Sequence, residues 1–212
     1  MQYRHDVFIS YRRGEVWTAW TREHFKHLLE VYLRQELGTD PDIFVDERIE
    51  EGADWPNELG EHLAMSRVMV AVFSGDYFSS QWCLHELDLM IGRSMMAAPT
   101  CRLIIPVIVH DGELIPDEVD RKLAAKFQAF RVAYIRRESD LYQQFSVAMK
   151  ELAPRIKAAI QSAPPYENGW LTEAKKRFDD VFKNNKIGKS VPVSNFDPKP
   201  LPILRVVPRL VV

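Results

Sequence analysis

The chain has 212 residues, of which 46% are hydrophobic, and this predicts one substantial core with an appendage rather than two full domains. Its 28 Lys and Arg residues nearly balance 30 Asp and Glu residues, so the net charge is only -2. A charge so close to zero creates no global field that attracts nucleic acid or an anionic membrane, and we expect neither as a partner.

The two cysteines, Cys83 and Cys101, are too few for a disulfide framework and lack the Cys-x-x-Cys spacing of zinc or redox sites. The N-terminus has no signal-peptide pattern, and no run approaches the roughly 20 apolar residues that span a bilayer. We therefore expect a cytoplasmic protein.

Five short runs rich in Val, Ile and Phe predict strands at 6–10, 42–45, 68–73, 103–109 and 130–135. The third and fourth runs are apolar at almost every position, which is typical of parallel strands covered on both faces. Between and after the runs, helical spacing predicts helices at 17–37, 54–65, 80–91, 117–127 and 140–160. Gly38 and Pro41 should end the first helix, Pro56 suits an early helical position, and Ser79 or Ser80 should begin the third helix.

This alternation of strand and helix predicts an α/β three-layer sandwich with right-handed crossovers. The composition changes after Pro164 and Pro165, where a short helix at about 171–183 precedes a proline-rich tail. We expect a main domain at 1–162 and a C-terminal extension at 163–212. The extension either packs on the core or on a neighbouring subunit, or it docks a partner or begins a linker to a further segment.

Several familiar chemistries have no motif here. The chain contains no G-x-G-x-x-G fingerprint, no phosphate-binding G-x-x-x-x-G-K-[ST] loop, no G-x-S-x-G elbow and no His-Glu-x-x-His pair. We expect no metal and no resident cofactor. Open parallel sheets bind ligands beyond the carboxyl ends of their strands, so candidate site residues should follow the first three strands.

Three stretches contain the first three predicted strands and the segments that follow them. They are HDVFISYRR at 5–13, IFVDERIEEGADWPNEL at 43–59, and SRVMVAVFSGDYFSSQWCLHEL at 66–87. Together they resemble the TIR (Toll/interleukin receptor) domain family, and in particular its bacterial, NAD-cleaving members. The resemblance implies a flavodoxin-like fold, with a five-stranded parallel sheet of order 2-1-3-4-5 and helices on both faces. It also implies that NAD is a substrate.

The resemblance implies a role for each matching residue. Glu86 matches the catalytic glutamate of the W-x-x-x-E element, and Trp82, four residues earlier, shares its helix face. The expected substrate-binding residues are Ser10, Tyr11, Arg12, Arg13, Phe44 and Trp82. The loop that gates access and makes contacts between copies contains Asp46, Arg48, Gly52 and Trp55.

A single carboxylate suits this reaction, because nicotinamide leaves a cationic pyridinium as a neutral ring and needs no general acid. Ordinary glycoside hydrolysis, by contrast, uses two carboxylates. Glu86 would hold the ribose hydroxyls and stabilise the oxocarbenium charge that grows toward the transition state. Attack by water gives ADP-ribose, and attack by an adenine nitrogen or a ribose hydroxyl gives a cyclic isomer. Both outcomes remain open.

About 50 residues of extension are too few for a sensor domain, so within the resembling family we expect a stand-alone, signal-producing TIR protein of the Thoeris antiphage type. This implies antiphage defence, self-association through TIR–TIR contacts, and a separate effector that responds to a nucleotide product. Two alternatives are a non-enzymatic TIR adaptor and an enzyme that acts on NADP or nucleic acid through the same carboxylate.

Overall fold

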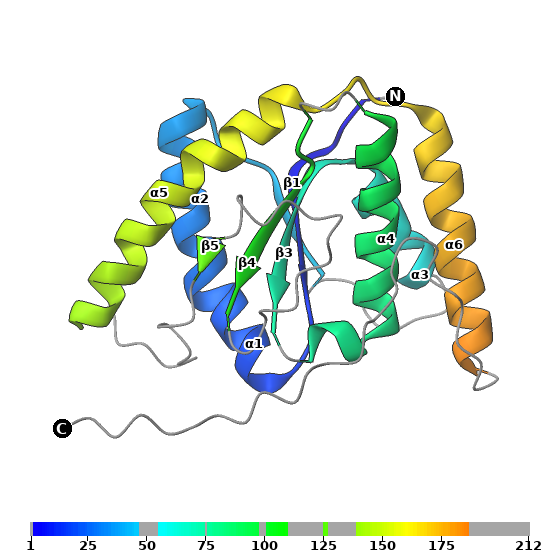
Figure 1. The fold of residues 1–212 in the computed structure, drawn as a ribbon, viewed down its shortest axis with the longest axis horizontal. Coiled ribbons are helices and arrows are strands. Elements are labelled where there is room, and N and C mark those ends of the chain that lie inside the picture. The colour runs from blue at the N-terminus through cyan, green and yellow to red at the C-terminus, as the bar shows by residue number, and fades with distance from the viewer. Residues whose placement is uncertain are drawn as a thin grey trace.

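The computed structural model describes residues 2–46, 55–74, 76–97, 101–109, 125–126 and 139–186. Its parallel sheet has the strand order β2-β1-β3-β4-β5 (Figure 1), which confirms the predicted flavodoxin-like order. The strands are β1 (His5–Tyr11), β2 (Ile43–Val45), β3 (Ser66–Phe73), β4 (Ile104–Ile108) and β5 (Ala125–Lys126).

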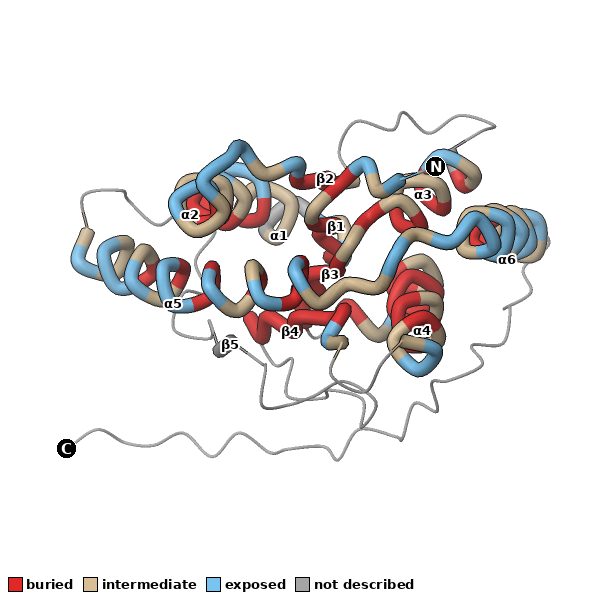
Figure 2. The backbone as a smooth tube through the Cα atoms, turned by 90° about the horizontal axis from the view of Figure 1, so that it is seen from above, coloured by how far each residue is buried: buried red, intermediate tan, exposed pale blue. Residues whose placement is uncertain are grey.

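Helices cover both faces of the sheet, as predicted. Figures 1 and 2 show α1, α2 and α5 on one face and α3, α4 and α6 on the other, with α6 outermost. The helical segments are α1 (Glu15–Trp20), the π-helix η1 (Thr21–Lys26), α2 (His27–Leu37), α3 (Trp55–Ala64), the 3₁₀ turn η2 (Tyr77–Ser79), α4 (Gln81–Met96), α5 (Asp140–Ser162) and α6 (Asn168–Lys186).

The alternation of side chains along β1 assigns its residues to two separate cores. Val7 and Ile9 join the core under α1, α2 and α5, whereas Phe8 joins the core under α3 and α4. Successive strand residues point to opposite faces, so Ser10 lies on the Phe8 side. Both cores consist of buried residues around the sheet (Figure 2). The period-two pattern of this strand therefore aims the Ser10 hydroxyl at α4.

The helix boundaries follow the expected capping residues. Gly38 ends α2 in the left-handed conformation, with φ 76°, and its N–H donates to the Arg34 carbonyl at 2.9 Å. Ser80 caps α4, because its Oγ accepts a hydrogen bond from the Cys83 N–H at 3.4 Å. The predicted end of the first helix and the predicted start of the third are confirmed.

The predicted helix at 117–127 is wrong at Ala125–Lys126, which form β5 and pair in parallel with Val107 and Ile108 of β4. This pairing satisfies backbone groups along the open side of β4, and such a tertiary gain overrides the high helical propensity of Ala and Lys, which is worth less than about 1 kcal/mol per residue. The rest of that segment, and the predicted strand at 130–135, lie outside the described residues. The extension's helix α6 is longer than the predicted 171–183, and the tail at 187–212 lies outside the described residues.

Helix α6 packs tightly against α3 and α4. Phe178 is fully buried and stacks on Trp82 of α4 with 5.9 Å between ring centroids. Gly60 of α3 permits the close approach, since a Cβ there would lie 3.1 Å from the Ala174 carbonyl oxygen. On the polar side, Arg177 forms an ion pair with Asp88, whose side chain is only 2% exposed. This part of the extension thus shares the core of the main domain.

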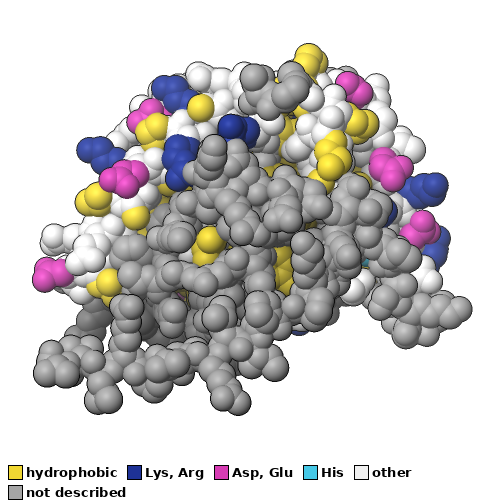
Figure 3. All heavy atoms as spheres, in the orientation of Figure 1, with side chains coloured by type: hydrophobic (Ala, Val, Ile, Leu, Met, Phe, Trp, Pro, Cys, Tyr) yellow, Lys and Arg dark blue, Asp and Glu magenta, His cyan; other side chains and the backbone are white. Residues whose placement is uncertain are grey.

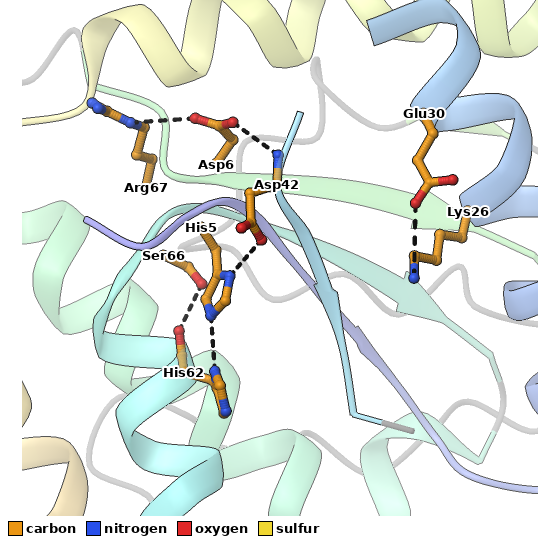
Figure 4. A network of polar contacts seen from close by, with 8 residues as sticks. All are labelled: His5, Asp6, Lys26, Glu30, Asp42, His62, Ser66 and Arg67. Carbon is orange, nitrogen blue, oxygen red and sulfur yellow. Dashed lines mark hydrogen bonds and ion pairs between the residues drawn. The ribbon is translucent and has the colours of Figure 1, made fainter. Parts of the chain in front are cut away.

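Two histidines and an aspartate link β1, β2 and α3 (Figure 4). His5 Nδ1 lies 2.6 Å from Asp42 Oδ1, and His5 Nε2 lies 2.8 Å from His62 Nδ1. The His62 ring also stacks on Phe44 at 3.9 Å. The contact between the two rings requires at least one of the facing nitrogens to be unprotonated. Burial, and then the proximity of His5, lower the pKa of His62 to about 4.

We expect this network to make stability fall in mild acid. The pKa of His62 is lowered from 6.5 to about 4 on folding, so the unfolded chain binds more protons between these values. The contribution is complete above pH 6.5 and is lost as the pH falls toward 4. Urea unfolding across this range measures the slope. His62→Gln, which keeps a hydrogen-bonding side chain, should flatten it, whereas the exposed-site control His27→Gln should not. A wild-type slope in His62→Gln would refute the assignment.

Charged side chains on the described surface are mixed in sign. In Figure 3, acidic and basic side chains alternate around the described part of this face, in keeping with the net charge of -2. Among the described helices, none is both long enough and apolar enough to cross a membrane.

Candidate active site

Glu86 lies on α4 at the carboxyl end of β1. Ser10 Oγ and Glu86 Oε2 form a hydrogen bond at 2.5 Å, and Glu86 is only 5% exposed. The contact joins two residues that are 76 positions apart in the sequence. It places the predicted catalytic carboxyl at the edge of the sheet where parallel α/β folds bind ligands.

The surroundings of Glu86 favour its protonated form. Burial raises the pKa of Glu86 from 4.5 to about 8, the Ser10 hydrogen bond and Arg13 oppose this rise, and the charge of Asp46 adds to it. A carboxyl poised near neutral pH is typical of a functional site rather than of a solvated surface residue. A cationic group bound nearby would stabilise the carboxylate and lower this pKa.

An ion pair joins the segments that follow β1 and β2. Arg13 Nη2 lies 2.6 Å from Asp46 Oδ1, and the two side chains are 34% and 12% exposed. Arg12, next to it, is exposed. Both arginines thus follow the strand that carries Ser10, and the charge of Arg13 acts on the Glu86 carboxyl. Asp46, predicted as a gating residue, is in this structure the partner of a predicted substrate-binding residue.

The predicted aromatic residues of the site make packing contacts. Tyr11 belongs to the core on the opposite face of the sheet from Ser10. Phe44 stacks on the His62 ring, and Trp82 stacks on Phe178 of α6. A role for Tyr11, Phe44 and Trp82 in holding substrate stays a prediction.

Three predicted loop residues lie wholly or partly outside the described residues. Arg48 and Gly52 lie outside the described residues. Trp55 is the first residue of α3, but its side chain also lies outside them. Their roles in gating and in contacts between copies stay predictions.

Tyr77 is a site residue that sequence reasoning missed. It is fully buried in η2, its hydroxyl lies 2.8 Å from Ser10 Oγ, and it also donates to the Cys83 carbonyl at 3.3 Å. The available signal was an aromatic residue in the polar segment SGDYFSS directly before α4. A buried tyrosine hydroxyl needs a partner, and such a residue at a helix start is a candidate to orient the helix.

Two other groups near Glu86 have different partners. Burial raises the pKa of the Cys83 thiol, which donates a weak hydrogen bond to the Tyr11 carbonyl at 3.5 Å. His85 Nδ1 accepts a hydrogen bond from Arg177 Nε at 3.0 Å. Cys83 is thus a packed thiol rather than an activated nucleophile, and His85 interacts with α6. Within the described ranges, no group of three His, Cys, Asp or Glu side chains is arranged to hold a metal ion.

The fold and the site define a class of protein: a flavodoxin-like α/β domain with a buried carboxyl at the carboxyl ends of its parallel strands. The profile of the TIR domain family matches residues 7–145. This chain therefore belongs to the TIR domain family, which confirms the predicted family; the bacterial, NAD-cleaving subtype stays a prediction.

Plant proteins are among its relatives. TMV resistance protein N of Nicotiana glutinosa is 29% identical over 155 residues, which cover 72% of this chain and 12% of the relative. Protein PHLOEM PROTEIN 2-LIKE A8 of Arabidopsis thaliana is 37% identical over 184 residues, which cover 85% of this chain and 44% of the relative. The chain thus spans less than half the length of either protein.

Among solved structures, the chain is similar to the TIR domains of the activated Roq1 resistosome, which directly recognizes the pathogen effector XopQ. The sequence identity is 25% and the TM-score is 0.37, and the match covers 85% of this chain and 99% of the other.

Proposed function

We propose that this protein is an NAD nucleosidase that cleaves the bond between nicotinamide and ribose, with Glu86 as the catalytic carboxylate. The observation that carries the proposal is the buried Glu86 carboxyl, hydrogen-bonded to Ser10 beside the Arg13–Asp46 ion pair. The TIR family includes enzymes that cleave NAD, and the W-x-x-x-E element that ends at Glu86 resembles the element that carries their catalytic glutamate. NAD is the substrate, and the reaction uses no resident cofactor.

The raised pKa of Glu86 suits a cationic substrate. The pyridinium of NAD, placed beside the carboxyl, favours the carboxylate and offsets part of its burial cost. As the glycosidic bond lengthens, positive charge moves from the pyridinium to the ribose carbon and its ring oxygen. The carboxylate then faces the growing oxocarbenium charge in a low-dielectric site, so its attraction is stronger in the transition state than in the ground state.

The neighbouring arginines supply the cations that a dinucleotide needs. No glycine-rich loop holds the pyrophosphate in this chain, whereas Arg12 and Arg13 follow β1 directly. Arg13 can bind phosphate oxygens if it exchanges its Asp46 partner for them. This exchange would connect substrate binding to the loop that follows β2.

The proposed setting is defence signalling with self-association. The relative from Nicotiana is named a resistance protein, which supports a defence role. For this chain we propose antiphage defence in the bacterial cytoplasm, in which TIR–TIR contacts assemble copies and a nucleotide product acts on a separate effector. The loop from Asp46 to Trp55 would make the contact between copies.

Incubating the purified protein with NAD tests the proposal. We expect nicotinamide to appear, with ADP-ribose or a cyclic isomer as the second product, identified by mass spectrometry. The assay should include high protein concentrations and a crowding agent, because self-association is part of the proposal. Parallel reactions with NADP and single-stranded DNA measure the choice of substrate. Absence of nicotinamide under all of these conditions would argue for an adaptor instead.

A further inference from the structure

The Ser10, Tyr77 and Glu86 side chains form one continuous hydrogen-bonded unit. Ser10 Oγ contacts Glu86 Oε2 at 2.5 Å and the Tyr77 hydroxyl at 2.8 Å, and the Tyr77 hydroxyl reaches the Cys83 carbonyl at 3.3 Å. Ser10, Tyr77 and Glu86 are at most 5% exposed, so hydrogen bonds with the protein outweigh those with solvent. The unit joins β1, η2 and α4.

This hydrogen-bonded unit has two proton arrangements, one for each protonation state of Glu86. Each hydroxyl carries one hydrogen and can accept another. With Glu86 ionised, Ser10 donates to the carboxylate and Tyr77 donates to Ser10. With Glu86 protonated, the carboxyl donates to Ser10, Ser10 donates to Tyr77, and Tyr77 donates to the Cys83 carbonyl. The same heavy-atom positions therefore satisfy both protonation states, and every hydrogen in the unit has an acceptor in each.

We propose that Tyr77 is a positioning residue for Glu86, acting through Ser10 in a hydrogen-bond chain whose direction reverses when Glu86 gains or loses its proton. The inference deepens the proposed function and, in its effect on catalysis, rests on it. The predicted effect of Tyr77 on the pKa of Glu86 does not depend on whether the protein cleaves NAD. The other charged or titratable groups that act on the Glu86 carboxyl are Asp46 after β2 and Arg13 after β1. Cys83 on α4 interacts with Glu86 and with Arg12.

The hydrogen-bond chain predicts that removing its two hydroxyls, one at a time, shifts the pKa of Glu86 in opposite directions. Ser10→Ala removes the donor to the carboxylate, which is a charge-assisted bond, so the pKa of Glu86 should rise. Tyr77→Phe leaves that donor in place. It removes two bonds from the protonated arrangement and one from the ionised arrangement, so it destabilises the protonated arrangement more. The pKa of Glu86 should therefore fall.

Carbon-13 NMR of protein labelled at the Glu side-chain carboxyl carbon measures this titration directly, and Glu86→Gln assigns the resonance. We expect shifts of about half a unit or more, upward for Ser10→Ala and downward for Tyr77→Phe. If NAD is cleaved, the pH midpoint of kcat/KM should move in the same directions. Tyr3→Phe, which removes a tyrosine hydroxyl bonded to Pro164 and Arg93, is the matched control and should leave the midpoint unchanged.

The outcomes separate the two proposals. Shifts of the same sign in both variants, or none in Tyr77→Phe, would overturn the positioning role even if the wild type releases nicotinamide. Opposite pKa shifts in a protein that does not cleave NAD would support the hydrogen-bond chain and reject the proposed NAD nucleosidase activity. The ring that Tyr77→Phe retains would keep its packing against Phe73 and Phe78, at 4.9 and 5.3 Å, so this variant should fold. If Tyr77→Phe does not fold, the titration of Ser10→Ala still tests the proposal. If the pKa of Glu86 does not rise in Ser10→Ala, the proposed hydrogen-bond chain is overturned.

Discussion

Replacing Glu86 with glutamine should reduce nicotinamide release by a factor of about 100 to 1,000 or more, because glutamine has nearly the same shape but cannot carry the negative charge that faces the oxocarbenium ion. Steady-state kinetics with NAD measures the loss. If the charge acts mainly in the transition state, kcat should fall while KM changes little. The control is Glu58→Gln, which neutralises an exposed glutamate on α3 and should leave the rate unchanged.

The same variant should not be less stable at mildly alkaline pH. The pKa of Glu86 is raised from 4.5 to about 8 on folding, so the folded state disfavours the carboxylate, and the contribution of the protonated group is lost as the pH rises through 8. A neutral glutamine avoids that loss. Thermal unfolding at about pH 8 should give a melting temperature no lower than that of the wild type. Full activity in Glu86→Gln would instead remove Glu86 from the mechanism.

The second large effect is expected at α6. Phe178→Ala should lower the free energy of unfolding by about 3–5 kcal/mol, since this fully buried ring packs with the core of α3 and α4 and stacks on Trp82. The ring also lies close to Gly60 of α3, where a Cβ would be 3.3 Å from Phe178 Cδ2, so its removal opens a cavity between the two helices. Urea unfolding followed by circular dichroism measures the change.

A matched control is Val147→Ala on α5, where the side chain is 57% exposed and the expected change is within about 0.5 kcal/mol. Equal effects at Phe178 and Val147 would contradict the packing of α6 on the main domain. The prediction also bears on the proposed boundary after residue 162, because a chain shortened there would lose Phe178 and Arg177. The latter is the ion-pair partner of the buried Asp88.

Local sequence patterns were sufficient for most of the fold. The alternating and apolar runs located β1 to β4, and Gly38 and Ser80 marked helix ends because their backbone and side-chain preferences act within a few residues. The strand order and the expected place of Glu86 came from the resemblance that three short motifs carry. Local preference failed at Ala125–Lys126, where pairing with β4 decides the conformation.

The sequence by itself thus determined the layers of the fold, the family and the identity of the candidate carboxyl. Only the tertiary structure decided its environment: Ser10 and Tyr77 beside it, Asp46 paired with Arg13, and a pKa near 8. The physical reason is distance along the chain. Ser10 and Glu86 are 76 residues apart, and Arg177 and Asp88 are 89 apart. No local pattern encodes such contacts, which arise when parallel strands bring their carboxyl ends together and a later helix packs against them.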